Sequence, residues 1–125
     1  MEERPMERIV LPRSLRRPIA FTGRKVAEGA TGLRWSDQDF SGRTGHSASV
    51  TIYEADDGRY VAHVAEISQW PGDPPVIDTV TVMPDIDAVI GWLRSRRRLP
   101  IAFRDRLIGQ LDPPPEDISE IPSDA

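Results

Sequence analysis

The side chains that could perform chemistry gather around a predicted hairpin in the middle of the chain. His63 stands among apolar residues, and four carboxylates lie near it in the sequence, at Glu54, Asp56, Asp57 and Glu66. A metal-dependent hydrolase needs carboxylates and a histidine that converge on one cation. In the register derived below, His63 and Glu54 share a face of the sheet, Glu66 lies on the opposite face, and the two aspartates form a turn. We therefore expect no metal site, no catalytic residue and no cofactor, and rank a metal-dependent hydrolase third among the functions considered.

Serine-based catalysis has no stronger support. The hydroxyls near His46 and His63 belong to Ser47, Ser49 and Ser68, and none of them lies in a nucleophile-elbow motif. The chain contains no cysteine, which excludes disulfides, zinc–thiolate sites and thiol nucleophiles. The sequence therefore predicts a protein that is not an enzyme.

A basic cluster late in the chain is the second group with chemical potential. It consists of Arg94, Arg96, Arg97, Arg98, Arg104 and Arg106. Such clusters neutralise phosphates in nucleic-acid-binding proteins, but they also suit helix C-terminal carbonyls or an acidic protein surface. Residues 35–93 hold two basic and ten acidic residues, whereas residues 94–108 hold six basic and one acidic. Because the acidic block would repel phosphate, we favour contact with an acidic surface, in the same chain or in a neighbouring subunit.

Three aromatic residues add a candidate interaction surface. Tyr53, Tyr60 and Trp70 are of types enriched at protein-binding hot spots, and we place them on or near the sheet face that is not the core. They could instead be stacking platforms for single-stranded nucleic acid, or simply cross-strand pairs. The predicted function is a small protein-binding or adaptor module whose partner is another protein or a second copy of the chain, as a homo-oligomer. A single-stranded nucleic-acid-binding protein that uses the basic cluster is the alternative.

The elements that position these residues begin with the hairpin. Residues 48–54 alternate between apolar and polar, which is the period of a half-buried strand. Asp57-Gly58 is a strong signal for a two-residue type I′ turn, and this loop pairs Glu54 with Val61 and Ile52 with His63. The register puts an apolar set on one face, formed by Val50, Ile52, Val61, Ala65 and Ile67.

The remaining elements follow from period and from proline. An earlier strand starts at residues 19–22 and extends towards residue 28, and a fourth strand covers residues 76–83. A helix is expected over residues 85–95, with Asp85 as its N-cap, and a second helix over residues 100–111. The stripe expected to pack on the sheet consists of Ile86, Val89, Ile90 and Leu93. The fold class is α+β: a four-stranded antiparallel β-meander closed by the helix at 85–95, with a second short helix and disordered termini.

The domain layout is a flexible basic head at residues 1–17, one domain at residues 18–111 and a disordered acidic tail at residues 112–125. Residues 29–45, with four glycines, form a long loop. No apolar run approaches membrane-spanning length and the start of the chain lacks the apolar core of a signal peptide, so we expect a cytoplasmic protein with no membrane partner. Arginine is abundant while Lys25 is the only lysine, which points to a GC-rich bacterial or phage genome.

Part of the chain resembles a known group of proteins. The run 35–75 contains WSDQDF, SVTIYEADDGRYVAHVAEISQW and PGDPP, with IAFTG upstream. It resembles a loosely defined group of small uncharacterised bacterial β-meander proteins with a Gly-Arg/Lys-Tyr-Val hairpin and a Ser-x-Trp-x-Gly turn, here at residues 58–61 and 68–72. The resemblance covers about half of the chain, and it implies a β-meander without implying an activity.

Overall fold

The computed structural model describes residues 5–32, 46–68, 72 and 76–120. The described strands form one antiparallel sheet in the order β1-β2-β3-β4-β5, followed by two helices and a 3-10 turn. Their bounds are β1 Glu7–Arg13, β2 Arg16–Gly32, β3 His46–Ala55, β4 Tyr60–Ser68, β5 Val76–Met83, α1 Ile86–Arg94, α2 Ile101–Leu111 and η2 Ile118–Glu120. The α+β meander is confirmed, but the prediction of four strands is wrong. The additional strand is β1, within the segment expected to be a flexible head.

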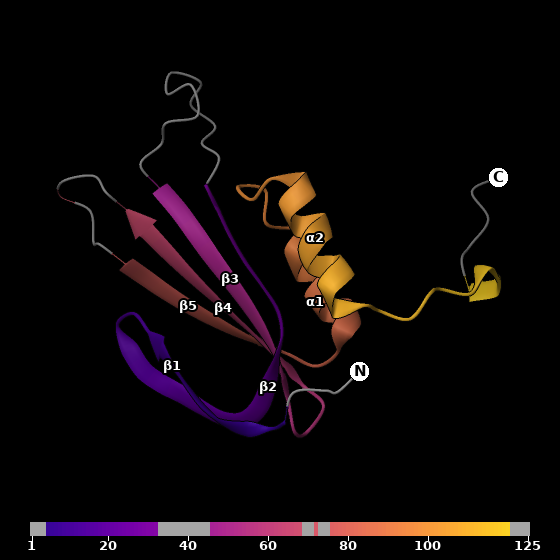
Figure 1. Cartoon of the computed structure of the whole chain (residues 1–125), viewed down its shortest axis with the longest axis horizontal. Coiled ribbons are helices and arrows are strands. Elements are labelled where there is room, and N and C mark those ends of the chain that lie inside the picture. Colours follow the sequence, from indigo (N-terminus) through magenta and orange to yellow (C-terminus); the bar gives the residue numbers. More distant parts are fainter. Residues whose placement is uncertain (1–4, 33–45, 69–71, 73–75, 121–125) are drawn as a thin grey trace, which may run out of the picture.

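The sheet curls into a half-barrel because β2 is long and changes partner along its length (Figure 1). Its first half pairs with β1, from Arg16 to Gly23, and its second half pairs with β3, from Gly23 to Gly32. A register shift between Lys25 and Ala27 marks a bulge, and bulges bend and twist a strand. The β1–β2 hairpin thereby reaches β5, where the backbone N–H of Ser14 donates to the carbonyl of Asp78 over 3.0 Å.

The β3–β4 hairpin forms where the sequence predicted it, but its register is shifted by one residue. Glu54 pairs with Tyr60 and Ile52 with Ala62, in place of Val61 and His63. The loop has three residues: the N–H of Gly58 donates to the carbonyl of Ala55, and Gly58 has a φ of +89°. This is a type I turn followed by a left-handed residue, the second common hairpin solution, which an Asp-Gly pair serves as well as a type I′ turn.

The shifted register changes the apolar face. Ala48, Val50 and Ile52 share the helix-covered face with Ala62 and Val64, whereas Val61 lies on the opposite face. Prediction of the face was therefore right for β3 and wrong for β4.

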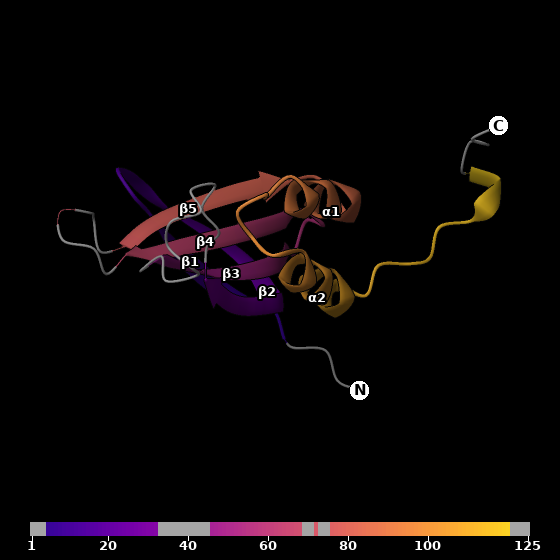
Figure 2. The same cartoon turned by 90° about the horizontal axis from the view of Figure 1, so that it is seen from above.

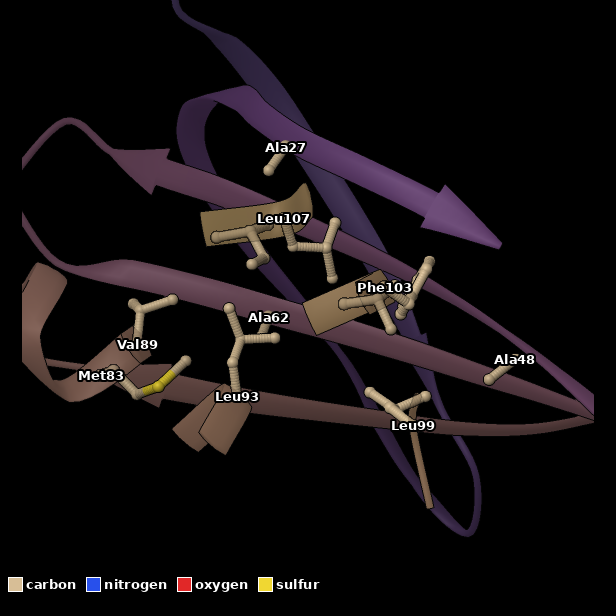
Figure 3. Packing of buried hydrophobic residues seen from close by; sticks show 11 residues of the cluster. Ala27, Ala48, Ala62, Met83, Val89, Leu93, Leu99, Phe103 and Leu107 are labelled. Atoms are coloured by element: carbon tan, nitrogen blue, oxygen red, sulfur yellow. The ribbon is translucent and has the colours of Figure 1, made fainter. Parts of the chain in front are cut away.

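The core lies between this face and the two helices (Figure 3). Asp85 caps α1 as predicted, because its carboxylate accepts a hydrogen bond from the N–H of Ala88 over 2.9 Å. Val89 and Leu93 of α1 are fully buried, as is Ile52 beneath the helices. The predicted stripe is thus right for Val89 and Leu93, whereas Ile90 is only partly buried and lies outside this cluster.

The second helix packs over the second half of β2 (Figure 2). Phe103 and Leu107 are its buried residues, and Pro100 occupies the N-cap position rather than the expected first helical position. The side chain of Gln110 bonds both backbone groups of Glu28, accepting from its N–H over 2.9 Å and donating to its carbonyl over 3.1 Å. After α2 the chain leaves the domain and forms η2 away from it (Figure 1). Within the described ranges, no helix is long and apolar enough to cross a membrane.

Candidate binding pocket at the end of the first helix

The connection between the two helices folds by a series of short turns. The backbone N–H of Ser95 donates to the carbonyls of Gly91 and Trp92, and its hydroxyl donates to the Trp92 carbonyl over 2.7 Å. The N–H of Leu99 then donates to the carbonyl of Arg96, and the Leu99 side chain is buried in the core. These turns and the buried side chain of Leu99 therefore hold Arg96, Arg97 and Arg98 at the surface.

These arginines rim a pocket of about 340 Å³ between the end of α1 and the sheet. The apolar wall comes from Val64 of β4, the indole of Trp92 and the side chain of Leu99. The polar rim consists of Glu66, Thr79, Ser95, Arg96, Arg97 and Arg98. Concave sites with apolar walls and a few convergent polar groups are the usual form of ligand sites in proteins.

The rim carries three positive charges and one negative charge. Arg98 uses part of its charge internally, because its Nη1 lies 3.1 Å from Oε1 of Glu66. The guanidinium carbon of Arg96 lies 4.6 Å above the Trp92 ring, a cation–π contact that leaves its N–H groups available for an anion. Within the described chain, no carboxylate forms an ion pair with Arg96 or Arg97. The pocket therefore presents excess positive charge beside its apolar wall.

The other members of the predicted basic cluster lie elsewhere. Arg104 ties the two helices together, because its Nη1 donates to the carbonyl of Arg94 over 2.7 Å at the end of α1. Arg106 lies over the ring of Phe103, with 5.6 Å between guanidinium carbon and ring centroid, and lines a separate small pocket together with Glu28. Of the six arginines in the predicted cluster, three line the pocket and three lie outside it. The first group is Arg96, Arg97 and Arg98, and the second is Arg94, Arg104 and Arg106.

The predicted aromatic surface is divided between the two faces of the sheet. Tyr53 lies on the face opposite the helices and meets Phe21 edge to face, with 5.6 Å between ring centroids. Tyr60 lies on the helix-covered face and packs against the core. Burial raises the pKa of both phenols, with a further rise from Glu28 at Tyr53 and from Glu54 at Tyr60. Trp70 lies outside the described residues.

His63 and the carboxylates around it form separate pairs. His63 Nε2 lies 2.8 Å from Oδ1 of Asp78 on β5. Glu54 and His63 lie on opposite faces of the sheet, contrary to the prediction, and Glu54 pairs with Arg24 over 2.6 Å. Asp57 pairs with Arg59 in the hairpin loop, and the hydrogen bonds from Arg59 lower the pKa of that carboxyl. Glu54 and Asp57 thus serve a cross-strand and a turn contact, whereas Glu66 pairs with Arg98.

The hydroxyls of Ser14 and Ser68 form contacts within the sheet. Ser14 Oγ accepts a hydrogen bond from the backbone N–H of Asp78 over 2.8 Å, so this hydroxyl anchors the half-barrel. Ser68 Oγ lies 3.3 Å from Nε2 of His46 as a cross-strand pair, which is longer than the usual hydroxyl hydrogen bond of about 2.8 Å. Among the described residues, no group of three His, Asp or Glu is arranged to hold a metal ion.

The residues that give the pocket its apolar wall were not predicted from the sequence. Trp92 is the clearest omission, and its signal was present: Arg96 follows it by four residues, a spacing at which two helical side chains meet. The register predicted from the sequence placed Val64 on the opposite face, so its part in the apolar wall was not predicted.

Comparison with protein-family models, with curated proteins and with solved structures finds no match for this chain.

Proposed function

We propose that the chain is a non-enzymatic protein-binding module, and that its site takes an acidic peptide segment bearing one apolar side chain. The observation that carries this proposal is the combination, in one pocket, of an apolar wall with two arginines that no described carboxylate pairs. An aliphatic or aromatic side chain of the partner would be buried against Trp92 and Leu99. Flanking carboxylates of the partner would accept hydrogen bonds from Arg96 and Arg97.

The residue types at the pocket fit protein recognition. Tryptophan and arginine are enriched among residues that dominate binding energy at protein interfaces. Arginine forms paired hydrogen bonds with carboxylates, and the contact between Arg96 and Trp92 pre-orders one guanidinium, which reduces the entropy lost on binding. A partner with both features would gain from burial and from charge.

Single-stranded nucleic acid fits this site less well. Binders of single strands combine a basic groove with several aromatic platforms on one surface. Here Tyr53 and Tyr60 lie on opposite faces of the sheet, and the helices cover the face that bears Tyr60. Glu66 also contributes a negative charge to the pocket itself.

Fluorescence anisotropy with labelled peptides tests the proposal. The probe is a short acidic peptide with one central leucine, compared with matched peptides in which leucine is replaced by serine or the acids by lysine. We expect saturable binding of the first, about tenfold weaker binding of the serine peptide because an apolar side chain is no longer buried, and none of the lysine peptide. Equal binding of the leucine and serine peptides would refute a role for the apolar wall.

Protein variants locate the binding and separate the two functions. Arg96→Ala and Arg97→Ala should each weaken binding of the acidic peptide by about two- to fivefold, through one lost ion pair. Arg106→Ala is the matched control, since it removes the same charge outside the pocket, and it should leave peptide affinity unchanged. A labelled single-stranded oligonucleotide that binds tightly at physiological salt, and that Arg106→Ala weakens as much as Arg97→Ala does, would favour nucleic acid and refute the proposal.

A further inference from the structure

The acidic tail of the chain has the composition that the arginine-rimmed pocket requires. Residues 109–125 contain five acidic residues and no basic residue. Within η2 and its flank, Ile118 is 84 % exposed and stands between Asp117 and Glu120. An isoleucine so exposed, with the carboxylates of Glu116 and Asp117 directly before it in the chain, matches an apolar pocket rimmed by arginines.

The tail also presents this isoleucine in a local structure of its own. The carboxylate of Asp117 accepts hydrogen bonds from the backbone N–H and the hydroxyl of Ser119, each over 2.9 Å. These bonds lower the pKa of Asp117, so the carboxylate stays charged. The turn projects Ile118 into solvent, and a partly ordered segment loses less conformational entropy when it binds.

The position of the tail favours binding to the pocket of a second molecule over binding to the pocket of its own chain. The pocket lies at the connection that precedes α2, whereas the tail leaves from the other end of that helix and points away from the domain in both views (Figures 1 and 2). The helix is 11 residues, or about 16 Å, long, and the six Cα-to-Cα steps from Asp112 to Ile118 span at most about 20 Å. Three prolines at 113–115 favour a stiff extended path rather than a reversal along the helix.

We propose that the pocket binds the η2 segment of a second copy of this chain, with Ile118 against Trp92 and the flanking carboxylates on Arg96 and Arg97. The proposal rests on the proposed function, since it names one occupant of the same pocket. The contact is head to tail, and it makes the tail a competitor of any other acidic partner. A single apolar anchor with a few ion pairs corresponds to a weak contact, with a dissociation constant on the order of 0.1–1 mM.

Complementation between two full-length variants tests the proposal by NMR. The first, Ile118→Asp, lacks the tail anchor and keeps the pocket; it is labelled with ¹⁵N. The second, Arg96→Glu with Arg97→Glu, lacks the pocket charge and keeps the tail; it is unlabelled. Adding the second to the first should shift the Trp92 indole and the amides of residues 95–99 in a saturable way. The matched control adds a chain that carries all three substitutions, which should leave these signals unmoved.

Three outcomes would overturn the proposal, and they differ in what else they affect. If the shifts are absent although the Ile118→Asp chain binds the acidic leucine peptide, the tail is not the occupant and the proposed function stands. If that chain binds neither, both proposals fall. If wild type and Ile118→Asp differ at Trp92 at every concentration, and mixing adds nothing, the tail binds its own pocket and the second copy is excluded.

Discussion

The position of Leu93 against that of Ile90 gives the sharpest test of how α1 is docked. Both are aliphatic residues on the same helix, and both lie on the apolar stripe read from the sequence. Leu93 is 0 % exposed within the core, whereas Ile90 is partly buried and lies outside the buried cluster. Replacing either by alanine removes the same number of carbon atoms, so a difference between the two variants reports burial alone.

The expected losses follow from that difference. Truncating Leu93 removes three fully buried carbons, worth about 2.4 kcal/mol at about 0.8 kcal/mol each, and leaves a cavity that the rigid sheet beneath cannot fill. Leu93→Ala should therefore lower the free energy of unfolding by about 3–4 kcal/mol. Ile90→Ala loses a smaller part of the transfer energy, since Ile90 is only partly buried, and alanine is the better helix former. Its loss should be about 1–2 kcal/mol.

Urea unfolding followed by circular dichroism measures both values under one set of conditions. Unchanged slopes against urea with different midpoints would show that stability alone has changed. Losses that are equal, or larger for Ile90→Ala, would refute the docking of α1 described here. The pocket would then lose its basis, because Trp92 and Arg96 take their positions from the same helix.

Three further predictions test other contacts. Gly29→Ala should destabilise the fold by about 1–3 kcal/mol, because a Cβ there would lie 2.8 Å from the ring of Phe103. Gly91→Ala is the matched control: it lies at an exposed helix position with open space and should stabilise the fold by about 0.5–1 kcal/mol. Urea unfolding measures both changes. Because burial raises the pKa of Tyr53 in the folded state, its contribution to stability is full below the unfolded pKa of about 10 and is lost as pH rises through the folded pKa; Tyr53→Phe should shallow that alkaline decline, and a decline of equal steepness in the variant would contradict the assignment. Asp85→Ala should cost about 1 kcal/mol through loss of the N-cap, and a thermal midpoint equal to that of the wild type would show that the cap is dispensable.

The fold class and most elements could be predicted because they depend on local pattern. The alternation at residues 48–54 and the capped stripe after Asp85 each specify an element without help from distant residues. The register of the hairpin could not be predicted in the same way. Two turns suit Asp-Gly, and the three-residue loop is accompanied by a hydrogen bond from the N–H of Asp56 to the carbonyl of Thr22, which lies on another strand.

The strand β1 was missed for a related reason. It is short, Val10 is 62 % exposed, and its pairing depends on the bent β2 that lies beside it. Local periodicity is weak in a strand whose two faces are both partly open to solvent. Its position is set by the hairpin and by the hydrogen bonds between Ser14 and Asp78, which join residues 64 positions apart.

The positive charge of the site was predicted from the sequence, but the pocket itself was not. The arginines were visible as a run, but the pocket needs the turns around Ser95 and a floor built from two strands. The expectation that acidic sheet residues would neutralise the basic cluster holds for one pair, Arg98 with Glu66. Other acids of the sheet have nearer partners, since Glu54 pairs with Arg24 and Asp78 with His63.

That distribution of partners leaves Arg96 and Arg97 without an ion pair among the described residues. Two of the ion pairs, Arg24–Glu54 and His63–Asp78, join neighbouring strands, whereas Arg98–Glu66 joins the sheet to the α1–α2 connection. The tail after residue 109 is a block of negative charge that no described ion pair uses. Opposite charges that lie apart in one chain favour association between molecules or capture of a third one.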